Sequence, residues 1–400
     1  MTFNQQPKIL FIGTFPPKKC GIASFTKDLV NAINMEIEGN AVISVCALDK
    51  KKNAALYQYP VAMVMDGHEI DSCIEIAAKI NKDPSVGLIC IEHEFGLYGG
   101  ELGEFLLGFL SLIEKPFIIR FHTMLSAPDP KRLKTVRTMG LMADKVIAMT
   151  HYSAKLLEED YQLPAEKIMI IPHGTHNNSI IEPNELKRKY NLENKLVLTS
   201  FGLLSPNKGI EKGIMSMKEI SASVPDALYI VLGQTHPNLL DNEGEKYRNY
   251  LQELIEENDL QENVRLINEY IPTKKLMEYL TLTDIYLFTS KDPNQAVSGT
   301  FLYAMSAGCP VISNSFVLAK EMLDEKTGII LETDKTDELA KKAILLLQND
   351  KLRKQMGHNA FLKTRYLTWK KVAGKHIRLF GRTLERKIFK TQSSDQFIRK

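Results

Sequence analysis

The segment from Gln295 to Ser313 contains the residues whose types and spacing best suit chemistry. Ser298, Gly299 and Thr300 stand where a helix is expected to begin, after a short predicted strand. The first turn of a helix has backbone N–H groups without partners and lies at the positive end of the helix dipole. These residues therefore predict a phosphate-binding site. An ordinary turn between a strand and a helix is the alternative.

A second loop with phosphate-binding character runs from Gly202 to Gly209, again between a predicted strand and a predicted helix. Gly202 lets the backbone approach a ligand closely, and Lys208 supplies a cation for phosphate oxygens. A solvated loop lysine is the alternative for this segment taken alone. Both loops belong to the same half of the chain and follow predicted strands, so their coincidence favours phosphate or diphosphate binding.

Polar residues also follow two predicted strands of the first half of the chain. His93 and Glu94 come after one strand, and Arg120 and His122 come at the end of the next. Ligands of parallel α/β sheets bind outside the carboxyl ends of the strands, so we expect these residues to line a binding cleft. A metal site that includes Glu92 is less favoured, because the spacing matches no standard ligand pattern.

The loop from Thr14 to Ser24 follows the first predicted strand. It turns near Gly21, and Ser24 is expected to cap the helix that follows. The loop lacks the glycine pattern of a dinucleotide site, and the chain has neither a Walker A motif nor a hydrolase nucleophile elbow. We therefore expect this loop to line a cleft.

These residues are positioned by an alternation of strands and helices that occurs twice along the chain. The strands are apolar almost throughout, which predicts parallel sheets covered by helices on both faces. The expected strands of the first series are 8–13, 41–48, 86–91, 117–121, 145–149 and 168–171, and those of the second are 196–201, 228–232, 264–267, 285–289 and 310–313.

Length and composition limit the class of protein. A chain of 400 residues exceeds what one core usually supports, so two domains are expected. With 44% hydrophobic and 25% charged residues, the composition is that of a globular protein, and a net charge of +3 gives no indication of nucleic-acid binding. The five cysteines are scattered and expected to be reduced, the first residues do not resemble a signal peptide, and no apolar run is long enough to span a membrane. These features predict a cytoplasmic protein.

The segment after Trp369 has a different pattern. Apolar residues recur at helical spacing on one face, and lysines and arginines occupy the other face from Lys370 to Lys390. We expect a helix that packs on the protein and leaves a solvated basic face. Peripheral contact of this face with an anionic membrane, at its inner surface, is the alternative.

With these residues identified, the chain resembles retaining glycosyltransferases of family 4. The resemblance covers nearly the whole chain and rests on the Gly21 loop, His122, the sequence Pro172-His173-Gly174, the loop from Gly202 to Gly209, and the stretch from Ala304 to Ile312.

The resemblance implies an α/β protein of the GT-B fold: two doubly wound, Rossmann-like domains that face each other across a cleft, with a C-terminal helix that crosses back to the first. Residues 1–180 would form the acceptor-side domain, 181–368 the donor-side domain, and 369–400 the returning helix.

The resemblance also implies roles for individual residues. His122 and Lys208 would be catalytic, and Gly21, His93 and Glu94 would lie on the acceptor side. No metal or other cofactor is expected. The donor would be bound by Gly202, Lys208, Gln295, Ser298, Gly299, Thr300 and Tyr303.

Three positions depart from the family pattern. Two glutamates, separated by seven residues, usually bind the donor sugar and the ribose, but Gln295 and Tyr303 occupy their places. An amide can still hydrogen-bond to a sugar, whereas a phenol offers one neutral group instead of a bidentate carboxylate. Leu203 replaces the usual arginine beside the Lys208 loop, so one phosphate-binding cation is missing.

The sequence therefore predicts a retaining glycosyltransferase that moves a sugar from a nucleotide-sugar donor to a glycan, a lipid-linked acceptor or a small molecule. The alternatives are a phosphorylase of the same fold, which uses a sugar phosphate without a nucleotide, and a non-catalytic sugar-binding protein.

Overall fold

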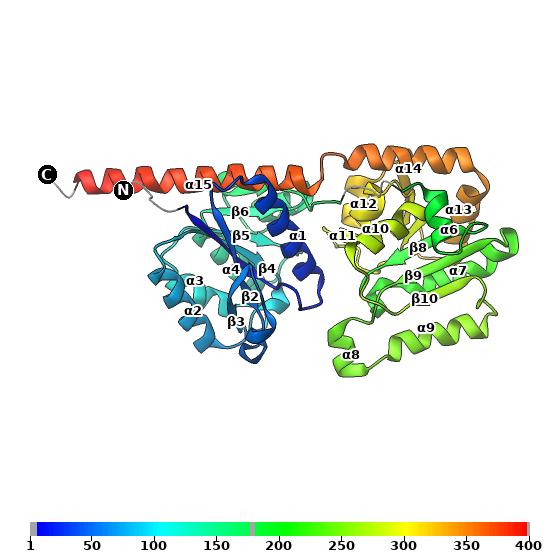
Figure 1. The fold of residues 1–400 in the computed structure, drawn as a ribbon, viewed down its shortest axis with the longest axis horizontal. Coiled ribbons are helices and arrows are strands. Elements are labelled where there is room, and N and C mark those ends of the chain that lie inside the picture. Colours follow the sequence, from blue (N-terminus) through cyan, green and yellow to red (C-terminus); the bar gives the residue numbers. More distant parts are fainter. Residues whose placement is uncertain (1–5, 177–180, 398–400) are drawn as a thin grey trace. The chain divides into compact units, whose positions relative to one another are not determined.

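The computed structural model describes residues 6–176 and 181–397. The chain divides into two compact units, of which the first combines Met1–Gly174 with Trp369–Lys400 and the second is Thr175–Thr368 (Figure 1). The division after Gly174 is earlier than the boundary after residue 180 that the sequence suggested. Each unit is an α/β structure with its own parallel sheet.

The first unit has a sheet of seven strands in the order β3-β2-β1-β4-β5-β6-β7. All six neighbouring pairs are parallel. The strands are β1 (Lys8–Gly13), β2 (Val42–Leu48), β3 (Val61–Met65), β4 (Val86–His93), β5 (Phe117–Phe121), β6 (Lys145–Ala148) and β7 (Ile168–Ile170). The central strands are almost completely buried, as their apolar sequences predict.

The helices of the first unit connect these strands. They are α1 (Gly21–Glu36), α2 (Ile70–Lys82), α3 (Phe105–Leu112), α4 (Pro130–Met142), α5 (His151–Glu159) and α15 (Trp369–Phe397), with short 3-10 turns at Lys51–Leu56, Phe95–Leu97 and Ala165–Lys167. The prediction that Ser24 caps the first helix is wrong. Helix α1 begins at Gly21, and the sulfur of Cys20 accepts a hydrogen bond from the backbone N–H of Ala23 at 3.3 Å.

Helix α15 follows the second unit in sequence but belongs to the first unit, where it packs beside α1 (Figure 1). Its buried residues recur at helical spacing and include Trp369, Val372, His376 and Phe380. Among the expected apolar stripe, Ile377 and Leu384 are half-buried, and the side chain of Ile388 lies outside the described residues.

The second unit has a sheet of six parallel strands in the order β10-β9-β8-β11-β12-β13. Both faces are covered: in β8, Val197 belongs to one apolar cluster and Leu198 to another, because successive side chains point to opposite faces. The strands are β8 (Leu196–Phe201), β9 (Ala227–Leu232), β10 (Val264–Ile267), β11 (Ile285–Phe288), β12 (Val311–Ser313) and β13 (Gly328–Ile330).

Helices again connect the strands of the second unit. They are α6 (Pro183–Lys189), α7 (Ile210–Ser223), α8 (Pro237–Glu243), α9 (Lys246–Glu257), α10 (Thr273–Leu282), α11 (Gly299–Ser306), α12 (Val317–Met322), α13 (Thr336–Gln348) and α14 (Asp350–Thr364), with a 3-10 turn at Pro206–Lys208. Within the described ranges, none of the helices combines the length and apolar composition that crossing a membrane requires.

Candidate functional site

A pocket in the second unit lies where β8 and β11 end, at the carboxyl edge of the sheet. It brings together three of the residues expected to bind a donor, Gly202, Lys208 and Thr300. Its other lining residues are Ser200, Phe201, Leu204, Ile210, Tyr286, Leu287, Phe288, Thr289 and Ser290. The loop after β8 and the start of α11 therefore open on one pocket.

Glycines give the loop after β8 its path. Gly202 and Gly209 have φ angles of 140° and 61°, which side chains rarely tolerate. A Cβ atom on Gly209 would stand 2.3 Å from the carbonyl oxygen of Thr289, so the loop and the end of β11 touch backbone to backbone. The hydroxyl of Thr289 also donates to the carbonyl oxygen of Lys208 at 2.9 Å. These contacts fix Lys208 at the rim of the pocket.

Lys208 is a partly buried cation. Burial lowers the pKa of its ammonium group, and no acidic group in the described parts of the chain opposes that shift. His236, in the loop after β9, lies close enough for burial and the charge of Lys208 to lower its pKa too. Backbone bonds between the two loops, from Leu204 N–H to Gln234 O and from His236 N–H to Leu204 O, hold them together at 2.9 Å each. This part of the pocket suits an anion.

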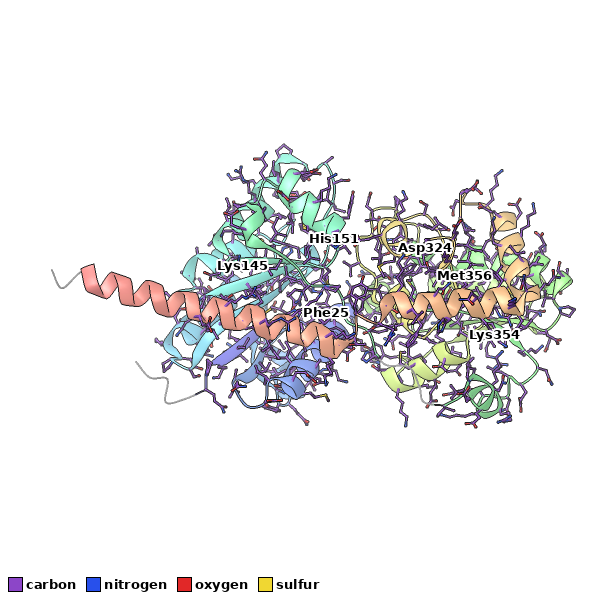
Figure 2. All side chains as sticks on the ribbon, turned by 90° about the horizontal axis from the view of Figure 1, so that it is seen from above. Phe25, Lys145, His151, Asp324, Lys354 and Met356 are labelled. Carbon is purple, nitrogen blue, oxygen red and sulfur yellow. The ribbon has the colours of Figure 1, made fainter. Side chains whose placement is uncertain are left out.

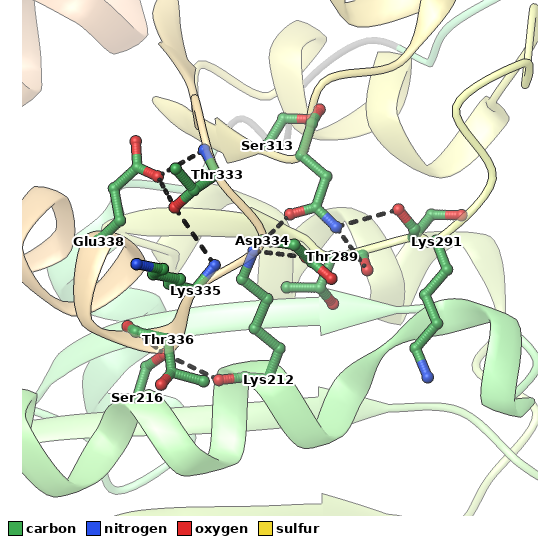
Figure 3. Close-up of polar contacts among 12 residues, drawn as sticks. Lys212, Ser216, Thr289, Lys291, Ser313, Thr333, Asp334, Lys335, Thr336 and Glu338 are labelled. Atoms are coloured by element: carbon green, nitrogen blue, oxygen red, sulfur yellow. Dashed lines mark hydrogen bonds and ion pairs between the residues drawn. The ribbon is translucent and has the colours of Figure 1, made fainter.

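Lys212, in the first turn of α7, has a different environment (Figure 3). Its ammonium group is buried and donates to Asn314 Oδ1 at 2.8 Å and to Asp334 Oδ1 at 2.9 Å. Asn314 in turn donates to the carbonyl oxygens of Thr289 and Ser290. Lys212 therefore holds loops together, whereas Lys208 is available to a ligand.

The start of α11 is partly occupied by its own cap. The Ser298 hydroxyl accepts from the backbone N–H of Phe301 at 3.4 Å and lies 3.1 Å from the Thr300 hydroxyl. Ser298 is thus a capping residue, and its hydroxyl is engaged. Gly299 and Thr300 are half-buried, and Thr300 reaches the pocket lining.

The two residues that replace the family glutamates are engaged within the protein. The Gln295 amide accepts from the Ser290 hydroxyl at 3.2 Å and donates to the carbonyl oxygen of Val297 at 2.9 Å, which braces the loop before α11. Tyr303 is buried, with its ring nearly parallel to that of Phe201 at a centroid distance of 6.4 Å. Phe201 itself lines the pocket, so Tyr303 supports the wall of the site through another ring.

In the first unit, β4 and β5 bring a buried ionic cluster together. Glu92 and Arg120 are both fully buried, with 2.6 Å between Glu92 Oε1 and Arg120 Nη1. The other carboxylate oxygen, Oε2, lies 2.7 Å from His122 Nε2. Burial alone would raise the pKa of Glu92, but the opposing effects of Arg120 and His122 prevail and lower it. Arg120 was expected to line a cleft, and the structure places it in the core instead.

The side chains of His93 and Glu94 have different surroundings although the two residues are adjacent in sequence. The His93 ring is fully buried among the rings of Phe95, Tyr98 and Phe121. Burial, and then the repulsion that a protonated His122 adds, lower the pKa of His93 to about 3, so the His93 ring is neutral. Glu94 is half-buried and accepts from the Phe95 backbone N–H and from the Thr123 hydroxyl.

Phe25 of α1, labelled in Figure 2, has ring contacts with residues of three expected motifs of the first unit. Its ring is 5.0 Å from those of His122 and His173 and 5.4 Å from that of Trp369. A Cβ atom on Gly174 would stand 2.2 Å from the Trp369 ring, which explains the glycine after His173. Gly21, at the first turn of α1, is exposed with nothing near its Cα that a side chain would meet.

Sequence reasoning missed His236 and His376 at these sites. His236 follows a strand end in the same way as Lys208, so that spacing could have identified it. His376 stands among the apolar residues of the α15 pattern, four residues after Val372, and a lone histidine on a buried face is a signal for a specific polar partner. Across the described ranges, no group of three or more His, Cys, Asp or Glu residues is placed to hold a metal ion.

Comparison with known proteins identifies the family. Residues 183–363 match the family model for group 1 glycosyl transferases, and residues 101–177 match the model for glycosyltransferase family 4, so that the two cover more than half of the chain. An uncharacterized glycosyltransferase of Methanocaldococcus jannaschii is 25% identical over 60% of this chain and 59% of its own length. Mannosylfructose-phosphate synthase of Agrobacterium fabrum is 25% identical over 42% of this chain and 37% of its own length. The matched regions thus span only about a third to three fifths of these relatives.

Solved structures share the fold over almost the whole chain. HepE of Anabaena, solved in complex with UDP, has a TM-score of 0.73 at 17% identity and covers 94% of this chain and 99% of its own. Sucrose-phosphate synthase of Thermosynechococcus elongatus has a TM-score of 0.76 at 16% identity and covers 96% of this chain and 100% of its own. The two parallel sheets, the return of α15 to the first unit and the two family matches agree, and the chain belongs to the family 4 type of glycosyltransferases with the GT-B fold.

Proposed function

We propose that this protein is a retaining glycosyltransferase that uses a nucleotide-sugar donor. The observation that carries the proposal is the pocket at the ends of β8 and β11, where Lys208 faces no acidic partner among the described residues and the start of α11 opens on the same space. A diphosphate would supply the missing negative charge. The UDP complex of HepE, a structural neighbour, supports the same ligand class.

The proposed chemistry needs positioning and charge stabilisation more than a nucleophile. Lys208 and the first-turn amides of α11 would hold the diphosphate as it leaves, and the negative charge that develops there would be stabilised in a partly buried site. His122, in the first unit, would contact the sugar that is transferred. No metal or other cofactor is part of this proposal.

The acceptor is proposed only as a class. Relatives include a phosphatidylinositol N-acetylglucosaminyltransferase subunit of Saccharomyces cerevisiae and a mannosylfructose-phosphate synthase, so lipid-linked, glycan and small-molecule acceptors all fit. For a lipid-linked acceptor, the exposed residues Lys370, Arg378 and Arg382 of α15 would favour contact with an anionic membrane. Sedimentation with anionic liposomes should then show binding at low salt that high salt abolishes, and no binding at low salt would remove the membrane proposal.

A phosphorylase is the second candidate, favoured by one observation. Gln295 and Tyr303 occupy the positions where carboxylates that bind the sugar and the ribose are usual. Their side chains instead contact Ser290, Val297 and Phe201 within the protein. A site without a ribose-binding carboxylate would suit a sugar phosphate without a nucleotide.

Thermal-shift measurements with UDP, GDP, ADP and inorganic phosphate distinguish the two candidates. A ligand that binds only the folded state raises the melting temperature. A rise with a nucleoside diphosphate, absent in Lys208→Ala and retained in Lys354→Ala, supports the transferase. Lys354 is a matched control, because it is an exposed lysine of α14 (Figure 2). A rise with inorganic phosphate alone supports the phosphorylase.

A further inference from the structure

In the buried ionic cluster of the first unit, the chemistry of the atoms determines which group donates and which accepts each hydrogen bond. His376 of α15 is fully buried, and its Nδ1 lies 2.8 Å from the carbonyl oxygen of Val372. A carbonyl oxygen only accepts, so Nδ1 donates. Burial, and then the charge of Arg120, lower the pKa of His376 to about 3, so the ring is neutral and its Nε2 is an acceptor.

Arg120 is the group that bonds to this acceptor. Its Nη2 donates to His376 Nε2, and its Nη1 donates to Glu92 Oε1. The ring of Phe25 covers the guanidinium group, with 4.8 Å between the guanidinium carbon and the ring centroid. A buried arginine paired and covered in this way keeps Glu92 ionised, because a carboxylate left alone at this depth would take up a proton.

An ionised carboxylate determines the proton position on the next ring. Glu92 has no proton to donate, so His122 Nε2, 2.7 Å from Oε2, must carry the hydrogen of that bond. When the ring is neutral, its lone pair is therefore on Nδ1. Among the described residues, none bonds to His122 Nδ1, and the side chain keeps 10% exposure. The Phe25 ring, edge-on at 5.0 Å, limits rotation of the imidazole.

We propose that Glu92, held by Arg120 and through it by His376 of α15, is the positioning residue of His122. It fixes the ring in the tautomer with hydrogen on Nε2, so that Nδ1 accepts a hydrogen bond from a hydroxyl group of the sugar. The role of Nδ1 rests on the proposed transferase function, whereas the tautomer is a property of the free protein.

The first test needs no variant and no ligand. The full chain labelled with 15N-histidine is measured by NMR, and the His122 signals are assigned by their loss in His122→Gln. In the neutral ring, Nδ1 should show the chemical shift of an unprotonated nitrogen and Nε2 that of a protonated one. The opposite pattern would overturn the proposal, whether or not the protein transfers a sugar.

The second test uses Glu92→Gln. Arg120 can only donate, so the new amide must turn its oxygen to Arg120 and its NH₂ group to His122. The imidazole should answer by moving its hydrogen to Nδ1, which removes the acceptor. We expect the NMR pattern to invert and kcat for turnover of UDP-glucose to fall about tenfold or more, because a wrong tautomer disables a positioned histidine. The Kd for UDP should stay within about twofold, since the proposed diphosphate site is in the second unit.

Glu104→Gln is the matched control in the same unit. Glu104 accepts from the Leu102 backbone N–H and pairs with Lys131, without contact to a histidine. This variant should change neither the His122 pattern nor turnover. Loss of turnover in Glu92→Gln with an unchanged tautomer would overturn the proposal. If Glu92→Gln does not fold, the NMR measurement of the His122 tautomer in the wild type decides. Absence of UDP binding and turnover in the wild type would count against the transferase function alone.

Discussion

At the scale of single residues, Lys208 is the group on which donor binding should depend most. Lys208→Ala removes a charge-assisted contact, which is worth about 1.5–3 kcal/mol, and UDP affinity should fall roughly 10- to 100-fold. Isothermal titration of UDP checks this value. Lys354→Ala, in which an exposed lysine of the same unit is removed, should bind UDP like the wild type. Equal affinity in both variants would show that the diphosphate does not contact Lys208.

The replacement of a carboxylate by Tyr303 gives a second expectation at this scale. A glutamate would hold ribose by two charge-assisted bonds, whereas Tyr303 is buried against Phe201 and has one neutral hydroxyl. UDP and 2′-deoxy-UDP should therefore bind with similar affinities. Competition titrations with the two nucleotides measure the difference, and a preference for UDP above about 2 kcal/mol would require another charged contact to the ribose.

At the scale of elements, the turn from β8 into α7 depends on Gly209. Gly209→Ala places a Cβ atom in a left-handed conformation, at a cost of about 1–2 kcal/mol, and presses it against the Thr289 carbonyl oxygen. Gly21 has no positive φ and open space around it, so Gly21→Ala meets neither backbone strain nor a clash. Urea unfolding should show a loss of at least about 1–2 kcal/mol in Gly209→Ala and a change within about 0.5 kcal/mol in Gly21→Ala. Equally small changes in both variants would mean that the loop and the end of β11 adjust without cost.

Most elements could be predicted because their signals are local. Apolar runs between turn residues identified the central strands. The edge strands β3 and β13 were not predicted although they are apolar too, because apolar runs of five and three residues do not distinguish a strand from a short buried segment of another kind. The pocket residues Gly202, Lys208 and Thr300 were found from loops that each lie at a strand end. The ionic cluster was not, because Arg120 and His376 are 256 residues apart in sequence and nothing local marks the pair. The types and spacing of Gln295 and Tyr303 likewise do not indicate which groups of the protein contact their side chains.

At the scale of the whole molecule, α15 adds apolar residues between Trp369 and Phe380 to the first unit's core. Phe380 is buried against Phe11 of β1, with 6.1 Å between ring centroids, whereas Arg378 on the same helix is exposed. Phe380→Ala should cost about 3–5 kcal/mol through the cavity it leaves, and Arg378→Ala within about 0.5 kcal/mol.

The two units have separate cores, so this loss should stay within one of them. Hydrogen exchange measured by mass spectrometry can follow each unit by its own peptides, which a single melting temperature cannot do. In Phe380→Ala, the amides of β1 should exchange faster while those of β8 keep the wild-type rate, and in Arg378→Ala both should keep it. If β8 loses protection as much as β1, the units unfold as one. If β1 keeps its protection, α15 contributes little to the core of the first unit, despite the burial of its inner face.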